Sequence, residues 1–302
     1  MLYEIQDGQL KLALTDFGGA LTSIHYAGRE YLWSGDPQFW SGQAPILFPI
    51  CGSLRDNHCL FRSAKNPETG QFLEGTMPRH GIVRKRDFEL LTQDASSISF
   101  RFRSDEETKT SYPFDFELIV HYEVKGRTIQ ISHQVRNLSS VVTMPCFLGA
   151  HPGFKCPLEN GQDFSDYYIE FPEDRQASLP RAITASGLID SSDRRDLELT
   201  DGHLPLDYSS FVEEDTLIFD QLRSRSVRLR SKQSPHYVQV NFEDFKYFMV
   251  WTSGQGAPFI ALEPWSGLST CTDESDYFED KANVTLIRPG QAKVWKYEIE
   301  VG

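Results

Sequence analysis

Residues 114–124 read FDFELIVHYEV, a stretch in which large apolar and polar side chains alternate. Successive side chains of a β-strand point to opposite faces, so this pattern predicts a strand with one face in the core. The buried face is expected to carry Phe114, Phe116, Leu118, Val120, Tyr122 and Val124. Such a face must be covered by another layer of structure.

Other stretches supply candidates for that layer. Residues 10–26 consist of two apolar-patterned runs on either side of the turn 16–19, as expected of an opening meander. Residues 247–251 and 259–262 are apolar throughout, which indicates central strands buried on both faces. The alternating pattern itself recurs at 98–102, 238–242 and 295–301.

Helical periodicity is confined to short segments at 104–111 and 273–281. Residues 173–215 are rich in Ser, Asp, Arg and Pro and keep no period, so we expect a long excursion with local turns, either a lid or a solvated structural loop. Many strands with few helices predict an all-β fold, a large antiparallel β-sandwich that forms a single domain over residues 1–302.

The composition excludes several function classes. The 302 residues include 30 basic and 43 acidic side chains, and the net charge of −13 disfavours binding to nucleic acid or to anionic membranes. Five cysteines without a CxxC pair argue against a zinc finger or a disulfide framework. The first residues lack the pattern of a signal peptide, and no apolar run reaches membrane length, so we expect a soluble cytoplasmic protein.

A histidine ends the apolar run of residues 147–154, FLGAHPGF. Pro152 restricts His151 to an extended conformation, and Gly149 and Gly153 allow backbone or ligand to approach closely. An imidazole held in this way is a candidate acid or base, because its ordinary pKa lies near neutrality. The alternative is a histidine with a structural role at a turn.

Three other stretches hold candidate site residues. His80 stands before Gly81, and Glu263 ends the apolar run 259–262 just before a proline. A charge at the end of a buried strand requires a partner or a task. Arg55 follows an apolar segment and a Gly-Ser turn, where its guanidinium could bind a ligand oxygen or a carboxylate. Taken alone, each of these residues could be structural.

Taken together, these stretches resemble the aldose 1-epimerase, or galactose mutarotase-like, family, and especially its LacX-type branch. The resemblance spans nearly the whole chain in the right order. It rests on Phe48-Pro49 to Arg55, His80-Gly81 with Arg84, residues 112–116 (YPFDF), His151-Pro152-Gly153-Phe154, Glu263-Pro264-Trp265, and the tail 281–301 with Arg288-Pro289-Gly290.

The resemblance implies a β-sandwich of the supersandwich kind with a sugar cleft, and interconversion of the α and β anomers of an aldose without cofactor or metal. It implies Glu263 as general base and His151 as general acid toward the ring oxygen. It further implies that His80 and Arg55 hold the sugar. For the family's aspartate between the second histidine and the glutamate we choose Asp220, with Asp207 and Asp215 as alternatives.

Mutarotation requires one proton to be taken from the anomeric hydroxyl and another to be given to the ring oxygen. We therefore expect an ionised Glu263 and a protonated His151 that face each other across the sugar. Aromatic rings suit the C–H faces of a sugar, and the candidates for this platform are Trp33, Trp40 and Trp265. Trp251 lies in an apolar run and is expected in the core.

Three alternative functions stay open at this point. Arg79, Arg84, Lys85 and Arg86 could form a phosphate site, which would make the substrate a hexose 6-phosphate. A non-catalytic sugar-binding protein could keep the same cleft. His80, His151 and Glu263 could hold zinc, although no metal-binding spacing supports this. The sequence leaves open which aldohexose is bound, whether it is phosphorylated, and whether the protein is a monomer or a homodimer.

Overall fold

The fold, seen in a computed structural model that describes residues 1–254 and 256–302, is built around a nine-stranded antiparallel sheet. The four alternating stretches at 98–102, 114–124, 238–242 and 295–301 each supply a strand, as predicted, and all four strands belong to this sheet. In spatial order its strands are β18 (His203–Pro205), β15 (Tyr167–Glu170), β20 (Ser226–Ser231), β21 (Tyr237–Asn241), β25 (Ala292–Val301), β11 (Thr128–Asn137), β10 (Phe116–Lys125), β9 (Ser97–Arg103) and β8 (Glu89–Gln93).

The apolar face of β10 is buried as the alternation predicts. Its register places Val120 opposite Phe100 of β9, and opposite His133 of β11. Burial of a large apolar side chain contributes about 1.5–3 kcal/mol. A shift of one residue would turn this whole face toward solvent, so the pattern fixes the register.

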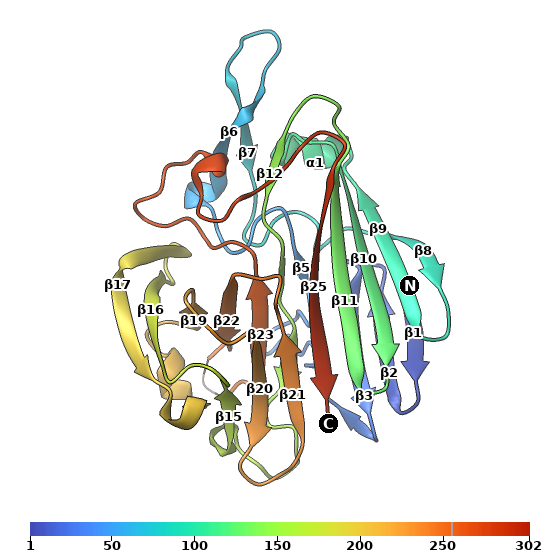
Figure 1. Cartoon of the computed structure of the whole chain (residues 1–302), viewed down its shortest axis with the longest axis vertical. Coiled ribbons are helices and arrows are strands. Elements are labelled where there is room, and N and C mark those ends of the chain that lie inside the picture. Colours follow the sequence, from blue (N-terminus) through green and yellow to red (C-terminus); the bar gives the residue numbers. More distant parts are fainter. Residues whose placement is uncertain (255) are drawn as a thin grey trace.

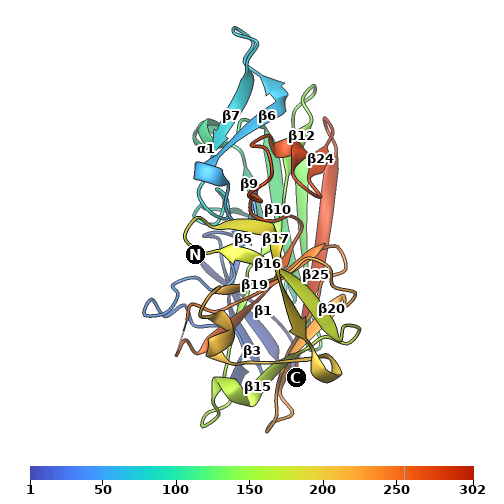
Figure 2. The ribbon, with the colours of Figure 1, turned by 90° about the vertical axis from the view of Figure 1, so that its left-hand side faces the viewer.

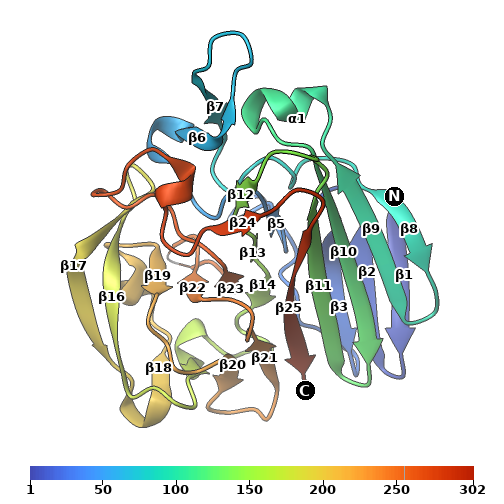
Figure 3. The same cartoon turned by 45° about the horizontal axis from the view of Figure 1, so that its top comes forward.

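The opening meander supplies the covering layer. Its four strands are β1 (Leu2–Asp7), β2 (Leu10–Thr15), β3 (Ala20–Tyr26) and β4 (Arg29–Glu30). The ring of Tyr3 packs edge-on against Phe100 at 5.3 Å, and the Tyr122 hydroxyl donates a hydrogen bond of 2.8 Å to the carbonyl of Gly19. Figure 1 and Figure 3 show β1 to β3 behind β9 to β11, which is the predicted sandwich.

A third sheet carries the candidate site. Its strand order is β19 (Thr216–Phe219), β22 (Tyr247–Trp251), β23 (Phe259–Trp265), β13 (Gly149–Ala150) and β5 (Ile46–Leu47), and β14 (Gly153–Lys155) also pairs with β23. The two apolar stretches are therefore central strands, as predicted, and every residue of β23 is buried.

Residues 173–215 are more regular than expected. Most of the segment forms a hairpin of β16 (Gln176–Ile183) and β17 (Leu188–Glu198), followed by η3 (Thr200–Gly202), β18 and η4 (Tyr208–Phe211). The prediction of an irregular excursion was wrong, because a two-stranded hairpin with mostly half-buried or exposed residues needs no apolar alternation. Figure 2 shows this hairpin on the side of the molecule that carries β19.

The remaining elements lie mainly at the end of the molecule opposite the C-terminus (Figure 1). The helix expected at 104–111 is α1 (Glu106–Ser111), which Asp105 caps. The segment expected at 273–281 contains only the short turn η5 (Phe278–Asp280). Among the described residues, no helix has the length and apolar character needed to cross a membrane. The other elements are η1 (Arg55–Asn57), β6 (His58–Lys65), β7 (Phe72–Thr76), β12 (Met144–Cys146), η2 (Phe164–Asp166) and β24 (Thr285–Ile287).

Candidate active site

His151 lies between the two short strands β13 and β14 and is fixed by the backbone on both sides. Its own N–H donates a hydrogen bond of 3.1 Å to the carbonyl of Pro45. Gly149 pairs with Trp265, and a Cβ atom at Gly153 would lie 2.7 Å from the ring of Trp40. The close approach predicted for these two glycines is therefore what the fold requires.

Glu263 points from β23 directly at His151. Its Oε2 atom lies 3.3 Å from His151 Nε2 and accepts a hydrogen bond of 3.1 Å from Trp265 Nε1. The Glu263 side chain is only 1% exposed, and that of His151 only 8%. The structure thus brings the two predicted catalytic residues into direct contact.

The protonation of this pair differs from the expected one. Burial lowers the pKa of His151 to about 3, while burial raises the pKa of Glu263 well above its ordinary value. Both directions favour a neutral imidazole and a protonated carboxyl. The prediction of an ionised Glu263 and a protonated His151 counted their mutual attraction and left out the loss of hydration. The pair holds one proton in either distribution.

The two residues also do not face each other across a gap, because 3.3 Å leaves no room for a sugar between these atoms. A sugar must reach both from the same side. His151 Nδ1 is buried and has no hydrogen-bond partner among the described residues. An unsatisfied buried polar atom of this kind costs about 1–3 kcal/mol.

His80 lies beside this pair in a strained turn. Its φ of 69° lies in the left-handed region, which non-glycine residues rarely adopt. The ring packs edge-on against His151 at 5.3 Å and against Trp265 at 5.6 Å. Burial and the nearby charge of Arg79 are among the causes that lower the pKa of His80, so its ring is neutral.

The contacts of His80 indicate which nitrogen carries the hydrogen. The buried N–H of Gly52 donates to Nδ1 at 3.2 Å, and Arg79 Nε lies 3.2 Å from Nε2. A neutral imidazole has one acceptor nitrogen. Since the exposed guanidinium of Arg79 can find water and the buried amide of Gly52 cannot, Nδ1 is the favoured acceptor. In the structure Arg79 Nε occupies the hydrogen-bonding position at Nε2, so a ligand can reach this nitrogen only when Arg79 turns away.

Aromatic rings surround the His151 side of the site. Trp40 lies over the imidazole at 4.9 Å, and Trp251 packs edge-on against it at 5.3 Å. Trp251 packs against the apolar cluster of Trp33 and Phe259, as expected, and this half-buried side chain also borders His151. Trp33 is buried and donates its Nε1–H to the carbonyl of Trp40, so it supports the platform from behind.

Two residues chosen from the sequence lie elsewhere. Arg55 turns away from the histidines, and its guanidinium is bound by the loop 271–276. Asp220 forms a bidentate ion pair with Arg194 of the hairpin, at 2.7 and 3.1 Å. Asp207 caps η4 by accepting from the N–H of Ser209. Neither Arg55 nor Asp220 is in a position to hold a ligand at the His151–Glu263 pair.

Near Glu263, where Arg55 and Asp220 were expected, the structure places Arg79 and Asp215 instead. Both line a small cavity with Trp265 and Ser269, and the charges of both act on the carboxyl of Glu263. The tip of the hairpin contributes residues 182–184 and 187–189 to the lining. The cavity is small, about 30 Å³.

The sequence signal for Arg79 was its position directly before His80, and the signal for Asp215 was its position directly before β19. His80, His151 and Glu263 do converge. Within the described ranges, however, no three His, Cys, Asp or Glu side chains form a group that could hold a metal ion.

Comparison with known proteins identifies the family. The family model described as aldose 1-epimerase matches residues 1–281. The chain belongs to the aldose 1-epimerase family. The chromosomal protein LacX of Lactococcus lactis subsp. lactis is 42% identical over 302 residues, which is 100% of this chain and 99% of LacX, so the chain is of the LacX type.

Solved structures of the same fold agree with this assignment. A galactose mutarotase related enzyme from Lactobacillus acidophilus superposes with a TM-score of 0.90 at 26% identity, covering 100% of this chain and 97% of that one. A galactose mutarotase-like protein from Lactobacillus casei gives 0.86 at 26% identity, covering 100% of both chains. As an aldose 1-epimerase family member, the chain is an isomerase of mutarotase type that acts on a sugar.

Proposed function

We propose that this aldose 1-epimerase family member interconverts the anomers of an aldohexose by proton exchange with the Glu263–His151 pair. The observation that supports this most is the buried contact of 3.3 Å between Glu263 Oε2 and His151 Nε2, beside the ring of His80. A binding site without chemistry does not need an acid and a base side by side.

The proton held by the pair moves from Glu263 to His151 when a sugar enters. Hydroxyl groups that donate to the carboxylate, and the positive charge of Arg79, favour the ionised form of Glu263. Glu263 then takes the proton of the anomeric hydroxyl while His151 gives its proton to the ring oxygen. The bond between C1 and the ring oxygen breaks, and an open-chain aldehyde forms.

Reclosure reverses these steps after rotation about the C1–C2 bond. In the aldehyde state the carboxyl is protonated and the imidazole neutral, which is the distribution that burial favours in the ligand-free site. The site is thus suited to the charge state of the intermediate. His80 and Arg79 hold the sugar hydroxyls, and Trp40 and Trp265 offer ring faces to its C–H groups.

Polarimetry of freshly dissolved α-glucose and α-galactose tests the proposal. We expect the protein to accelerate the approach to equilibrium well beyond the spontaneous rate with one of these sugars. If the protein binds sugar but leaves every tested aldose and aldose phosphate at the spontaneous rate, it is a binding protein and the proposal fails.

A hexose 6-phosphate is a second candidate substrate, and two arginines favour it. Neither Arg79 nor Arg84 forms an ion pair with a carboxylate in the part of the chain that the structure describes. Burial and the charge of Arg79 lower the pKa of Arg84. A phosphate bound between the two guanidinium groups would offset both effects. Arg86 is not available for this purpose, because it pairs with Asp105 and Glu107.

If the phosphorylated sugar is the substrate, its KM is expected to be about 10- to 100-fold below that of the free sugar, since a charge-assisted contact contributes about 1.5–3 kcal/mol. Arg84→Gln should raise the KM for glucose 6-phosphate and leave that for glucose unchanged. Mutarotation followed by proton NMR at both substrates measures this. Equal KM values for the two sugars would rule the candidate out.

A further inference from the structure

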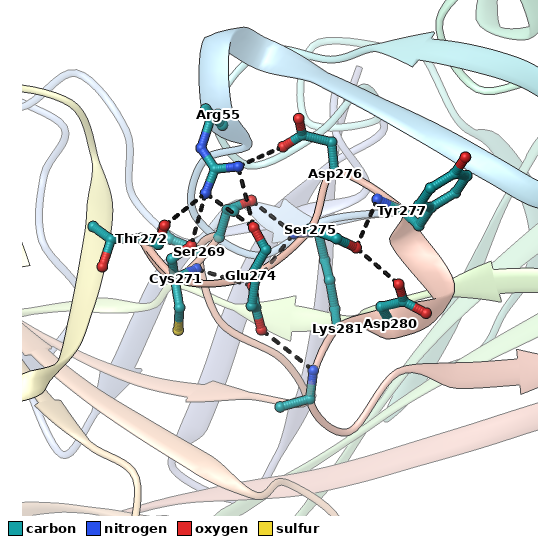
Figure 4. A network of polar contacts seen from close by, with 12 residues as sticks. Arg55, Ser269, Cys271, Thr272, Glu274, Ser275, Asp276, Tyr277, Asp280 and Lys281 are labelled. Atoms are coloured by element: carbon teal, nitrogen blue, oxygen red, sulfur yellow. Dashed lines mark hydrogen bonds and ion pairs between the residues drawn. The ribbon is translucent and has the colours of Figure 1, made fainter.

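Arg55 makes its contacts with a single loop, with three backbone carbonyl groups and one carboxylate. Nη1 contacts the carbonyl of Glu274 at 3.1 Å and Oδ1 of Asp276 at 2.8 Å. Nη2 contacts three carbonyl oxygens, those of Cys271, Thr272 and Glu274, each at 3.1 Å (Figure 4). One rigid guanidinium therefore fixes the path of residues 271–276.

The same loop is held from its other side by a buried lysine. Lys281 Nζ donates to Thr270 Oγ1 at 2.7 Å and lies 3.4 Å from Glu274 Oε2, and its side chain is only 3% exposed. The carboxylate of Glu274 also accepts from the N–H of Cys271 at 2.9 Å. Residues 270–274 are thus bound by two cations from different parts of the chain (Figure 4).

This loop is the place where the hairpin tip docks. The N–H of Ile189 donates to the carbonyl of Thr270 at 3.1 Å, and the N–H of Thr272 donates to the carbonyl of Ile189 at 2.8 Å. Ile189 and Ser269 both line the cavity beside Arg79 and Trp265. The hairpin tip and Ser269, the residue directly before this loop, therefore both contribute to the wall of this cavity.

The loop also touches the turn that holds His80. Thr270 N–H donates to the Ser53 carbonyl, and Ser53 N–H donates to Ser269 Oγ, both at 2.9 Å. A Cβ atom at Gly52 would lie 2.0 Å from Ser269 Oγ, so the two segments are in close contact. Gly52 in turn donates to the ring of His80.

We propose that Arg55 is a positioning residue: it fixes the loop 270–276 on which the tip of the β16–β17 hairpin docks, and so sets the wall of the pocket on the side of Ser269 and Ile189. This inference rests on the proposed function for its kinetic consequence. Arg55 does not touch the Glu263–His151 pair, so it acts on substrate binding and leaves proton transfer intact.

Kinetics of Arg55→Met test the proposal. We expect KM to rise about 10-fold with kcat within about 3-fold of wild type, and no change in the pH dependence of kcat, because the proton-transferring groups are unchanged. Arg55→Lys should lie between the two, since an ammonium can pair with Asp276 but cannot span the carbonyl groups. A fall in kcat at constant KM would mean a merely structural role and would overturn the proposal.

Arg62→Met is the matched control. Arg62 pairs with Asp280 and lies 3.9 Å over the ring of Tyr277. These two partners follow the loop 270–276 in the chain, and among the residues that the structure describes Arg62 makes no hydrogen bond to the hairpin tip. Arg62→Met also removes an arginine–carboxylate pair, but the carboxylate of this pair lies outside the loop 270–276. KM should therefore stay at the wild-type value. An equal rise of KM in both variants would contradict a specific role of Arg55.

Hydrogen exchange gives a readout that does not depend on activity. In Arg55→Met we expect about 10-fold faster exchange in peptides covering 183–190 as well as 269–276, and in Arg62→Met unchanged exchange at 183–190. If no sugar is turned over but the hairpin tip loosens, the proposed function fails and the positioning role stands. If the tip keeps its protection in Arg55→Met, the positioning role fails whatever the activity.

Discussion

Glu263→Gln and His151→Asn are each expected to lower kcat for mutarotation by about 10²–10⁴-fold, the usual contribution of a positioned acid or base. Neither amide can exchange a proton with the sugar, whereas the size and the hydrogen-bonding capacity of the side chains are largely kept. In Glu263→Gln the carbonyl oxygen of the new amide can still accept from Trp265 Nε1, as Glu263 Oε2 does at 3.1 Å. Polarimetry at saturating sugar measures the loss.

The double variant distinguishes an acid and a base that act as a coupled pair from two groups that act independently. Because ring opening needs both transfers, one proton to Glu263 and another from His151, either substitution should disable the coupled exchange, and the double variant should be no slower than the slower single one. Losses that multiply would argue for independent roles. Thermal unfolding serves as the control, since both variants must remain folded.

Much of the fold follows from short-range patterns in the sequence. Alternation at 98–102 and 114–124 identifies β9 and β10, because a strand with one buried face must alternate. The hairpin at 176–198 escaped this logic, since its side chains are mostly half-buried or exposed. Residues that need not be buried carry no periodic signal.

The candidate site was only partly predictable for a similar reason. Pro152 and two glycines fix the backbone at His151, and a carboxylate that ends an apolar strand is conspicuous at Glu263. The direction of a side chain on a turn is not encoded in this way. Arg55 follows the turn that contacts His80, yet its guanidinium points to the loop 271–276.

The choice between the two aspartates shows the same limit. Asp215 and Asp220 flank the four residues of β19 at opposite ends, about 17 Å apart along an extended strand. Only the neighbours tell them apart: Asp215 lines the cavity, and Asp220 pairs with Arg194. The two aspartates differ only in their contacts with distant parts of the chain, and the residues next to them in the sequence do not indicate these contacts.

Buried histidines should make the protein sensitive to acid. Burial lowers the pKa of His133 to about 3 and that of His80 well below 6.5. Below pH 6.5 the unfolded chain therefore binds a proton on each ring, while the folded protein keeps both rings neutral. Their stabilising effect is full above pH 6.5 and is lost as the pH falls toward the folded-state pKa. Between pH 6.5 and 4.5, His151 and Glu263 cancel, because the pair holds one proton whether folded or unfolded.

His133→Leu is therefore expected to stabilise the protein, and increasingly so in acid. Both ring nitrogens of His133 are buried without partners among the described residues, and its side chain is fully buried on β11. Removal of an unsatisfied polar group should add about 1–3 kcal/mol to the free energy of unfolding at pH 7. Below pH 6.5 the advantage should grow by up to about 1.4 kcal/mol per pH unit.

Urea unfolding of wild type and His133→Leu between pH 6.5 and 4.5 measures both effects. His25→Leu, at an exposed position of β3, is the matched control and should follow the wild-type pH dependence. If the wild-type and His133→Leu curves stay parallel across this range, His133 takes up its proton in the folded state as easily as in the unfolded one. The stacking of its ring on Tyr297, at 6.0 Å and 4°, would then have to tolerate a buried cation, which a dry apolar environment strongly disfavours.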